Sequence, residues 1–596
     1  MQRKWKIKPH DSGAIADLER SLNVSPVIAH LLAVRGMKDT ASIREFLKKP
    51  FQNLRAPASL PGVMVATERL AHAIRENQRI CIYGDYDADG MTSTAILVRC
   101  LKMLGGNVTY FVPSRLDDGY GLSDDALQRV HKEGAELVVT VDCGIASVHE
   151  AQTCKSLGMD LIITDHHQYG EQLPEAIALV HPALPGTDYP FAGLCGAGVA
   201  LKLAWGLCQV MSGSEKVPPA HRQFLLLALG LAAIGTVADV VPLLDENRLI
   251  VQHGLQFLHC ETVVGLEQLK KLNKLDQKRS LTAEDIGFTL APRLNAAGRL
   301  GQAQLGVELL TTDSTERALA LSEYIHQLNS SRESLERKIQ KAANKMVREQ
   351  HLQDEPAIVL ASRDWHKGVI GIVAGRIAEK YNRPTILIAQ EESANGKPAV
   401  GSGRTACNVN LFEALNSTRP WLIGCGGHRA AAGLQIEDNQ IDMFRDAFCQ
   451  YVSEHTSPQD LEPCLTIDLE VPLSHLTLKT VGELEQLAPF GMQNRRPIFC
   501  SRGVKLPTAP QKMGSGERHL SLRLQQADVK FRAVSFGNAE WADQMDWQGG
   551  EFDFAFKPFI NEFRGRRSVE LQVVDWRPHV VHDDANSPPS TVSQSR

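Results

Sequence analysis

Short apolar runs alternate with amphipathic stretches in the first half of the chain, and four of these runs predict strands. They lie at 80–83, 108–112, 137–141 and 161–164. Short apolar runs separated by helix-like stretches are typical of parallel strands, which are buried on both faces of an α/β sheet. A helix from Met91 to Leu104, closed by two glycines, connects the first two runs. We therefore predict a doubly wound parallel-sheet α/β domain over 61–305, preceded by a small helical segment at 1–60.

The second half of the chain divides into three further parts. Apolar positions at alternating steps of four and three predict a long connecting helix over 306–355, and the stretch 307–355 contains no glycine or proline. Strand patterns around a helical stretch predict a second, smaller α/β domain over 356–455. The alternation of Phe552, Phe554 and Phe556 is the period of half-buried strands and favours an OB-fold-like β-barrel over 463–578. We expect a disordered tail at 579–596.

Composition narrows the class of protein. The 43% hydrophobic content is ordinary for a globular protein, and the twelve cysteines contain no Cys-x-x-Cys pair. Free thiols and a polar amino terminus without a signal-peptide pattern favour the cytoplasm. The apolar run 224–238 is shorter than the roughly 20 residues that cross a bilayer, so we expect a buried helix and no membrane association.

Charge indicates where a polyanion would bind. The net charge of −5 argues against a protein that coats nucleic acid through its global charge. Lys and Arg nevertheless outnumber Asp and Glu between Arg495 and Arg577. A basic end on an acidic body predicts that a polyanion is bound locally, at the predicted barrel.

Acidic and histidine side chains follow directly after the predicted strands and after the apolar run. In parallel sheets, ligands bind outside the carboxyl ends of the strands, so these side chains are expected to converge. A ligand set of several carboxylates and one histidine nitrogen suits Mn²⁺ or Mg²⁺. The candidates suffice for two ions with a carboxylate between them, the arrangement that hydrolyses phosphodiesters. They are Asp85, Asp87, Asp89, Asp142, His166 and Asp239.

Each motif also has a simpler interpretation when it is taken alone. The segment 85–90 resembles the start of a calcium-binding EF-hand loop, but Ile96 stands where that loop needs glutamate. Asp165, His166 and His167 alone could be a solvated loop. The occurrence of all the motifs in order at strand ends favours the metal site.

A second group of residues is expected to bind phosphate. Arginine is bidentate for phosphate, and glycine-rich turns allow backbone amides to approach an anion. An alternative for Arg293 and Arg299 is a structural role in ion pairs between domains. The candidates are Arg115, Arg293, Asn295, Arg299, Ser402, Arg404 and His428.

These motifs together resemble the DHH phosphoesterase superfamily. The resemblance rests on 165–167, 85–90, 141–144 and 237–239, and on the glycine-histidine segment 426–433, which resembles a motif of the associated second domain. Tyr83 stands where the pyrophosphatase branch has histidine, which favours the branch of single-stranded-DNA exonucleases. The resemblance extends over nearly the whole chain.

The resemblance implies how the candidate ligands are shared. One ion would be held by Asp87 and Asp142 with Asp85 beside them. The other would be held by Asp89, Asp142, His166 and Asp239, so that Asp142 bridges the two. His167 would face the scissile phosphate, and Asp165 would orient the histidine pair.

The implied activity is a metal-dependent exonuclease that uses two Mn²⁺ or Mg²⁺ ions. It would release mononucleotides from the 5′ end of single-stranded DNA in repair and recombination. Single-stranded-DNA-binding protein and a DNA helicase are the implied partners, and a monomer is adequate for this task.

Two other functions fit the same sequence less well. A phosphodiesterase for short oligoribonucleotides or cyclic dinucleotides is usually smaller and would give the basic barrel no task. A non-catalytic single-strand-binding replication subunit can lose its metal ligands, whereas every acid and histidine of the site is present here.

Overall fold

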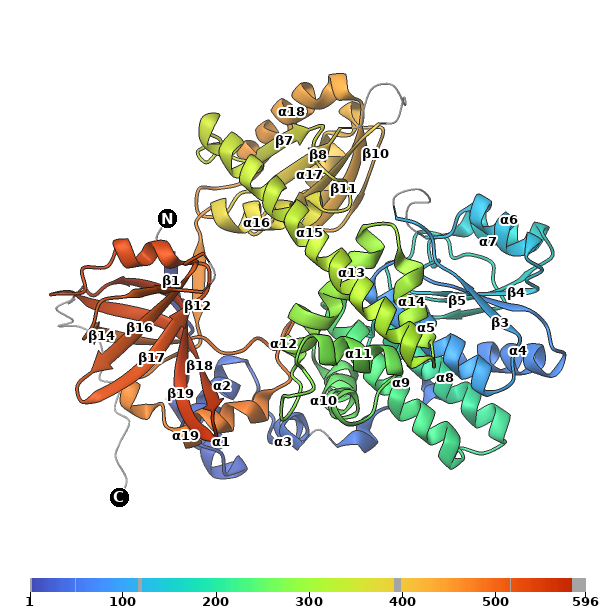
Figure 1. Ribbon diagram of the computed structural model, residues 1–596, viewed down its shortest axis with the longest axis horizontal. Helices are drawn as coiled ribbons and strands as arrows, with labels where there is room; N and C mark the ends of the chain where they lie inside the picture. Colours follow the sequence, from blue (N-terminus) through green and yellow to red (C-terminus); the bar gives the residue numbers. More distant parts are fainter. Residues whose placement is uncertain (1–2, 49, 116–120, 391–397, 515, 581–596) are drawn as a thin grey trace. The chain divides into compact units, whose positions relative to one another are not determined.

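The computed structural model describes residues 3–48, 50–115, 121–390, 398–514 and 516–580 (Figure 1). Most of the predicted disordered tail therefore lies outside the described residues. The chain forms two compact units. The first contains 1–47, 463–488 and 496–596, and the second contains 48–462 together with 489–495.

The second unit begins with a five-stranded sheet that is parallel throughout, as predicted. Its strand order is β3-β2-β4-β5-β6. Because β2 lies between β3 and β4, the chain changes direction across the sheet at the carboxyl ends of β2 and β4, where α/β folds bind ligands. The strands are β2 (Ile80–Tyr83), β3 (Val108–Phe111), β4 (Leu137–Val141), β5 (Asp160–Thr164) and β6 (Ala178–Val180).

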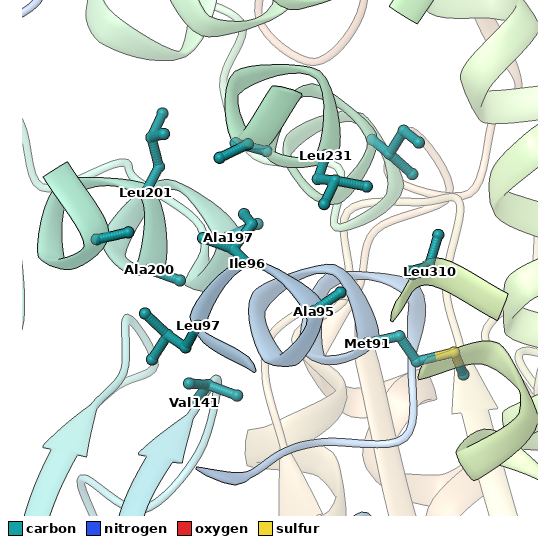
Figure 2. Packing of buried hydrophobic residues seen from close by; sticks show 14 of the residues in the cluster. Met91, Ala95, Ile96, Leu97, Val141, Ala197, Ala200, Leu201, Leu231 and Leu310 are labelled. Carbon is teal, nitrogen blue, oxygen red and sulfur yellow. The ribbon is translucent and has the colours of Figure 1, made fainter. Parts of the chain in front are cut away.

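Helix α5 (Ala88–Met103) forms the centre of the core beside this sheet. Figure 2 shows its apolar side chains, among them Met91, Ile96 and Leu97, packed among side chains of α8, α9 and α14. Each fully buried side chain of this size contributes about 1.5–3 kcal/mol. The amino end of α5 is therefore a rigid support for the turn at 84–87 that precedes it.

Around this sheet lie the other helices of the domain. They are α4 (Val63–Arg75), α6 (Asp124–Lys132), α7 (Val148–Ser156), α8 (Gly196–Ser212), α9 (Pro219–Ala238), α10 (Asp245–Cys260), α11 (Val264–Leu272), α12 (Ala283–Asp285), α13 (Ala291–Arg299) and α14 (Ala303–Thr311). Of these helices, α6 and α7 pack on a second cluster of buried side chains and the rest on the core that contains α5.

Helix α9 begins at Pro219, before the apolar run 224–238, and its 20 residues are long enough to cross a bilayer, contrary to the expectation from the run alone. By length and composition, α9 is the one helix among the described residues that is able to cross a membrane. Its middle, from Ala228 to Thr236, is buried against neighbouring helices. Burial of this kind is typical of a core helix in a globular domain.

The long connecting helix begins later than predicted. Helix α14 ends at Thr311, and α15 runs from Thr315 to Glu349. The interruption arises at Ser314, whose side chain accepts a hydrogen bond from the Arg317 amide and caps α15. A serine cap inside an otherwise helical apolar pattern is a start signal that the periodicity alone does not reveal.

The smaller α/β domain of the same unit has a mixed sheet in the order β10-β11-β9-β8-β7. Strands β7 and β8 are parallel, and the remaining pairs are antiparallel. The strands are β7 (Ile358–Ser362), β8 (Thr385–Ala389), β9 (Ala399–Arg404), β10 (Gly424–Gly427) and β11 (Ala431–Ile436). The helices are α16 (Ile370–Tyr381), α17 (Leu411–Ser417) and α18 (Ile441–His455).

The first unit contains the predicted barrel. Its sheet has the order β13-β14-β18-β19-β17-β16-β15, and an additional pairing between β14 and β16 closes it. The strands are β13 (Leu469–Glu470), β14 (Phe499–Lys505), β15 (Gln511–Met513), β16 (His519–Gln526), β17 (Val529–Ser535), β18 (Glu551–Phe563) and β19 (Arg566–Pro578). Helix α19 (Leu478–Leu484) belongs to the same unit.

The amino-terminal segment is not a purely helical, separate lead-in. Strand β1 (Lys4–Ile7) pairs in parallel with β12 (Cys464–Ile467), and residues 1–47 belong to the unit of the barrel. Helices α1 (Ser12–Leu22), α2 (Pro26–Val34) and α3 (Thr40–Lys48) follow β1. Local sequence could not predict β1, because its partner strand lies more than 450 residues away in the chain.

Candidate metal centre and anion site

The turn between β2 and α5 positions three of the candidate acids. Asp87 caps α5, and its carboxylate accepts hydrogen bonds from the amides of Asp89 at 2.8 Å and Gly90 at 3.0 Å. Asp89, in the first turn of α5, is buried, and so is Asp85 at the end of β2. The strand, the cap and the helix together fix all three carboxylates at one edge of the sheet.

The amino end of α8 holds Asp89 from the opposite side. The amides of Gly196 and Ala197 donate to the two Asp89 carboxylate oxygens at 2.7 and 2.9 Å. A helix amino terminus attracts negative charge, so this contact favours the ionised acid. A Cβ atom on Gly196 would lie 2.7 Å from the Asp142 carboxylate, so only glycine fits. The contacts of this segment with two candidate ligands were not predicted from the sequence.

Asp142 occupies the central place that was predicted for a bridging ligand. It follows β4 in a left-handed conformation, with φ of 62°, which aspartate tolerates better than most residues. Its Oδ1 lies 3.0 Å from His166 Nε2. The same nitrogen lies 3.5 Å from Asp239 Oδ2 and 3.8 Å from Asp89 Oδ2. Asp239 is delivered by the carboxyl end of α9.

These side chains form overlapping groups whose ligand atoms lie within 4.8 Å of one another. One group contains Asp85, Asp87 and Asp142, and another contains Asp89, His166 and Asp239. A third group, Asp142, His166 and His167, shares one residue with each of these two. The buried atoms Asp85 Oδ1 and His166 Nε2 accept or donate no hydrogen bond within the described residues. Buried polar atoms without such a bond, in a set of carboxylates and one imidazole, fit divalent cations.

Burial and mutual repulsion raise the pKa values of the acids in this cluster. Burial, and next the charge of neighbouring acids, raises the pKa of Asp89 to about 6 and that of Asp239 to about 8. The same causes raise the pKa values of Asp85 and Asp142 well above their usual range. Burial lowers the pKa of His166 to about 3, which keeps its imidazole neutral. A neutral imidazole is the form that binds a metal.

Asp165 contacts both histidines through a single carboxylate oxygen, and only His167 is held by its ring. Its Oδ1 accepts hydrogen bonds from the amides of His166 and His167 and from His167 Nδ1 at 2.7 Å. Burial opposes a charge on His167, but the Asp165 carboxylate outweighs it and raises the pKa of His167 to about 9. His167 is therefore charged at neutral pH, whereas His166 is not.

His181 is a functional candidate that the sequence analysis missed. It is buried after β6, and its Nδ1 accepts a hydrogen bond from the Ala183 amide at 3.0 Å. The proton therefore lies on Nε2, which donates to the His167 carbonyl at 2.8 Å. His181 thus fixes the backbone that carries His167. A single histidine outside any motif gives no sequence signal of this role.

Four of the predicted phosphate ligands, Arg115, Arg299, Ser402 and Arg404, lie close together in the same unit. Burial, and next the charges of Arg115 and Arg404, lowers the pKa of Arg299 to about 10. Arg404 Nη1 donates to Ser402 Oγ at 3.1 Å, and both side chains face Gly371 in the first turn of α16. Burial, and next the charge of Arg115, also lowers the pKa of Arg404. The three guanidinium groups therefore form a positive site that suits a phosphate, and Arg404 lies at the amino end of α16.

The remaining predicted phosphate ligands have other surroundings. Asn295 Oδ1 accepts a hydrogen bond from the Ala88 amide at 2.7 Å, at the start of α5. Arg293 donates to the Thr289 carbonyl and to His326 Nδ1. These contacts give both residues structural roles beside any contact with a substrate. His428 is exposed in the turn between β10 and β11, and its amide donates to the Ala431 carbonyl.

Comparisons with known proteins agree with this architecture. Three family models match the chain: the DHH family N-terminal domain over 79–232, the DHHA1 domain over 354–454 and the RecJ OB domain over 467–575. The single-stranded-DNA-specific exonuclease RecJ of Bacillus subtilis is 36% identical over 572 residues, covering 96% of this chain and 70% of that protein. The chain belongs to the RecJ family of single-stranded-DNA-specific exonucleases.

Other members of the RecJ family extend the match to whole proteins and to solved structures. RecJ of Salmonella typhimurium is 34% identical, covering 97% of this chain and 100% of that protein. The crystal structure of Thermus thermophilus RecJ in complex with Mn²⁺ has a TM-score of 0.77 at 32% identity, covering 98% of this chain and 81% of that chain. The crystal structure of the same Thermus thermophilus protein with Mg²⁺ has a TM-score of 0.72 at 30% identity, covering 96% of this chain and 78% of that chain.

These findings confirm the predicted fold class and the predicted activity. The chain is a metal-dependent single-stranded-DNA exonuclease, and its cofactor is Mn²⁺ or Mg²⁺. The alternatives, a dinucleotide phosphodiesterase and a non-catalytic subunit, lose their support. The roles of individual residues stay predictions.

Proposed function

We propose that the chain hydrolyses single-stranded DNA from its 5′ end to mononucleotides, at the cluster of acids around Asp142. The observation that carries this proposal is the sharing of ligands between neighbouring groups at one sheet edge. Asp85, Asp87 and Asp142 would hold one cation, and Asp89, Asp142, His166 and Asp239 the other. Two divalent cations in such a site supply an activated water and neutralise charge on the phosphoryl group.

The chain's own residues would complete the chemistry around the cations. Asp165 holds His167 by Nδ1, so a proton that His167 gives to an oxygen of the scissile phosphate would leave from Nε2. The charged imidazole also places positive charge beside the phosphoryl oxygens. Asp165 is then a positioning residue, and Asp142 and His167 touch the reacting atoms or the ions.

The convergent arginines would set the polarity of digestion. A terminal phosphate carries more negative charge than a phosphodiester, so the site formed by Arg115, Arg299, Ser402 and Arg404 favours the end of a strand over its middle. His428 and Arg293 would border this site. Anchoring the 5′ phosphate there would leave the next phosphodiester at the metal centre.

Digestion of end-labelled single strands tests this polarity. We expect a 5′ label to be released as a mononucleotide at early times, and strands with a 5′ phosphate to be digested faster than those with a 5′ hydroxyl. Arg404→Ala should remove most of that difference, at a cost of about 2–3 kcal/mol, because it deletes a charge-assisted contact. Early release of a 3′ label would contradict the proposed direction.

The other parts of the chain would have supporting tasks. We assign catalysis to 61–305, the phosphate-anchoring site to Arg115 and Arg299 of that domain together with Ser402 and Arg404 of 356–455, and the grip on the rest of the strand to the barrel at 463–578. Working as a monomer in the cytoplasm, the enzyme would act in DNA repair and recombination, after a helicase and beside single-stranded-DNA-binding protein. Digestion of strands coated with that protein, with and without a helicase, measures this cooperation.

A further inference from the structure

Residues 489–495 form a compact turn that belongs to the unit of the metal centre. In sequence, they are flanked on both sides by segments of the other unit. Gly491 and Asn494 form a β-bridge, and the buried Asn494 side chain donates to the Pro489 carbonyl at 2.7 Å. The turn therefore holds its own shape and can act as a rigid support.

This turn packs against the loop that follows α9. The Leu243 amide donates to the Met492 carbonyl at 2.9 Å. A Cβ atom on Gly491 would lie 2.6 Å from Leu243 Cδ1, so the turn and the loop approach each other more closely than any residue larger than glycine would allow. Leu243 is buried at this contact, with 2% of its surface exposed.

The supported loop carries Asp239 and contains a strained residue. Val240 has φ of 62°, a left-handed conformation that is a true outlier for a β-branched residue. Such a strained conformation persists only where the surrounding structure enforces it. Within the domain, Asn247 fixes the same loop through the Pro242 carbonyl at 3.0 Å and ties it to the Gly193 carbonyl. The Met492 carbonyl fixes the loop at a second point, because it accepts a hydrogen bond from the amide of Leu243, the residue after Pro242.

We infer that the turn 489–495 is a positioning element of the metal centre. Seated against Leu243, it holds Val240 in its strained conformation and thereby keeps Asp239 aimed at His166. The inference rests on the proposed role of Asp239 as a metal ligand. By reciprocity, cation binding at Asp239 stabilises the seated turn as much as the seated turn strengthens cation binding.

Mn²⁺ binding to the full-length protein tests this inference without relying on cleavage. Gly491→Ala places a methyl group against Leu243 and should weaken Mn²⁺ binding about tenfold, the usual effect of losing a support behind a metal ligand. The loss of the free Mn²⁺ signal in electron paramagnetic resonance measures this change. Gly549→Ala is the matched control, because nothing lies within 4 Å of its added Cβ.

Two further measurements separate positioning from general destabilisation. Affinity for single-stranded DNA in EDTA should stay within twofold of wild type in Gly491→Ala, while kcat falls. Leu243→Ala removes the atom that the new methyl group meets, so the double variant should recover part of the Mn²⁺ affinity. Unchanged Mn²⁺ affinity in a folded Gly491→Ala variant would overturn the inference.

Wild-type protein gives a test that needs no variant. Hydrogen exchange of the Leu243 amide and of a peptide covering 489–495 should slow when Mn²⁺ is added. No change on Mn²⁺ addition would also overturn the inference. Asp239→Ala distinguishes the two levels of the proposal: if it leaves Mn²⁺ binding intact, the proposed metal site fails, and not only the role of the turn.

Discussion

The carboxyl groups of buried Asp89 and partly buried Asp239 lie among other acids, and their pKa values of about 6 and about 8 make a prediction for the metal-free protein. These values exceed those of an unfolded chain, so the folded state binds more protons than the unfolded state between about pH 4 and 8. The free energy of unfolding should therefore fall as pH rises through this window. Thermal unfolding in EDTA at several pH values measures the effect.

The variant Asp239→Asn and the addition of Mn²⁺ are the two controls for this pH dependence of stability. Asp239→Asn removes one of the buried charges, so its metal-free unfolding temperature should be higher than that of wild type at pH 8. Saturating Mn²⁺ should flatten the pH dependence of wild type, because a bound cation compensates the carboxylates. A wild-type protein whose metal-free stability rises between pH 5 and 8 would contradict the electrostatics described for the site.

His181 acts on the site through the backbone of His167, and its removal should affect turnover more than binding. His181→Ala deletes the donor to the His167 carbonyl and should lower kcat about tenfold, with KM nearly unchanged. His181→Gln retains a donor at a similar reach and should recover part of the rate. Equal losses in both variants, or a loss confined to KM, would show that His181 has another role.

At the scale of elements, strands β16 and β17 carry like charges directly opposite each other. Exposed Arg523 pairs in register with Arg532, whose guanidinium is bound by Glu570. Like charges across a ladder are destabilising, and a bound polyanion would relieve them. Arg523→Ala should therefore weaken single-stranded-DNA binding and reduce its log–log salt slope by about 0.7, the contribution of one phosphate contact.

Arg20→Ala, an exposed arginine of α1 paired with Asp17, is the matched control for that substitution. It should leave the salt slope unchanged. An equal slope for wild type and Arg523→Ala would remove this face of the barrel from the DNA-binding surface.

The elements themselves were predictable where one local signal dominates. Buried runs such as Leu137–Val141 and the alternating phenylalanines of β18 are strands as expected, because burial sets their pattern. The start of α15 was missed, because a local cap at Ser314 overrides an apolar period that continues through it. Strand β1 was missed, because only a distant partner makes it a strand.

At the scale of the whole molecule, the ligands themselves gave a local sequence signal, whereas the residues that hold them in place did not. The acids and histidines were predictable, because parallel strands bring their carboxyl ends to one edge and the motifs stand at those ends. The amides of Gly196 and Ala197, the ring of His181 and the turn at Met492 were not. They act through backbone atoms or through one tautomer of a histidine ring, and the identity of a residue does not predict such contacts.

The central claim is that the cluster around Asp142 binds two cations, and counting them tests it most directly. Mn²⁺ titration of the purified full-length chain, followed by electron paramagnetic resonance, should give two tightly bound ions for wild type. Asp142→Ala should bind fewer ions and release no nucleotide from labelled single strands, while still binding DNA in EDTA. An Asp142→Ala protein that binds two Mn²⁺ ions with wild-type affinity and still digests DNA would contradict the account.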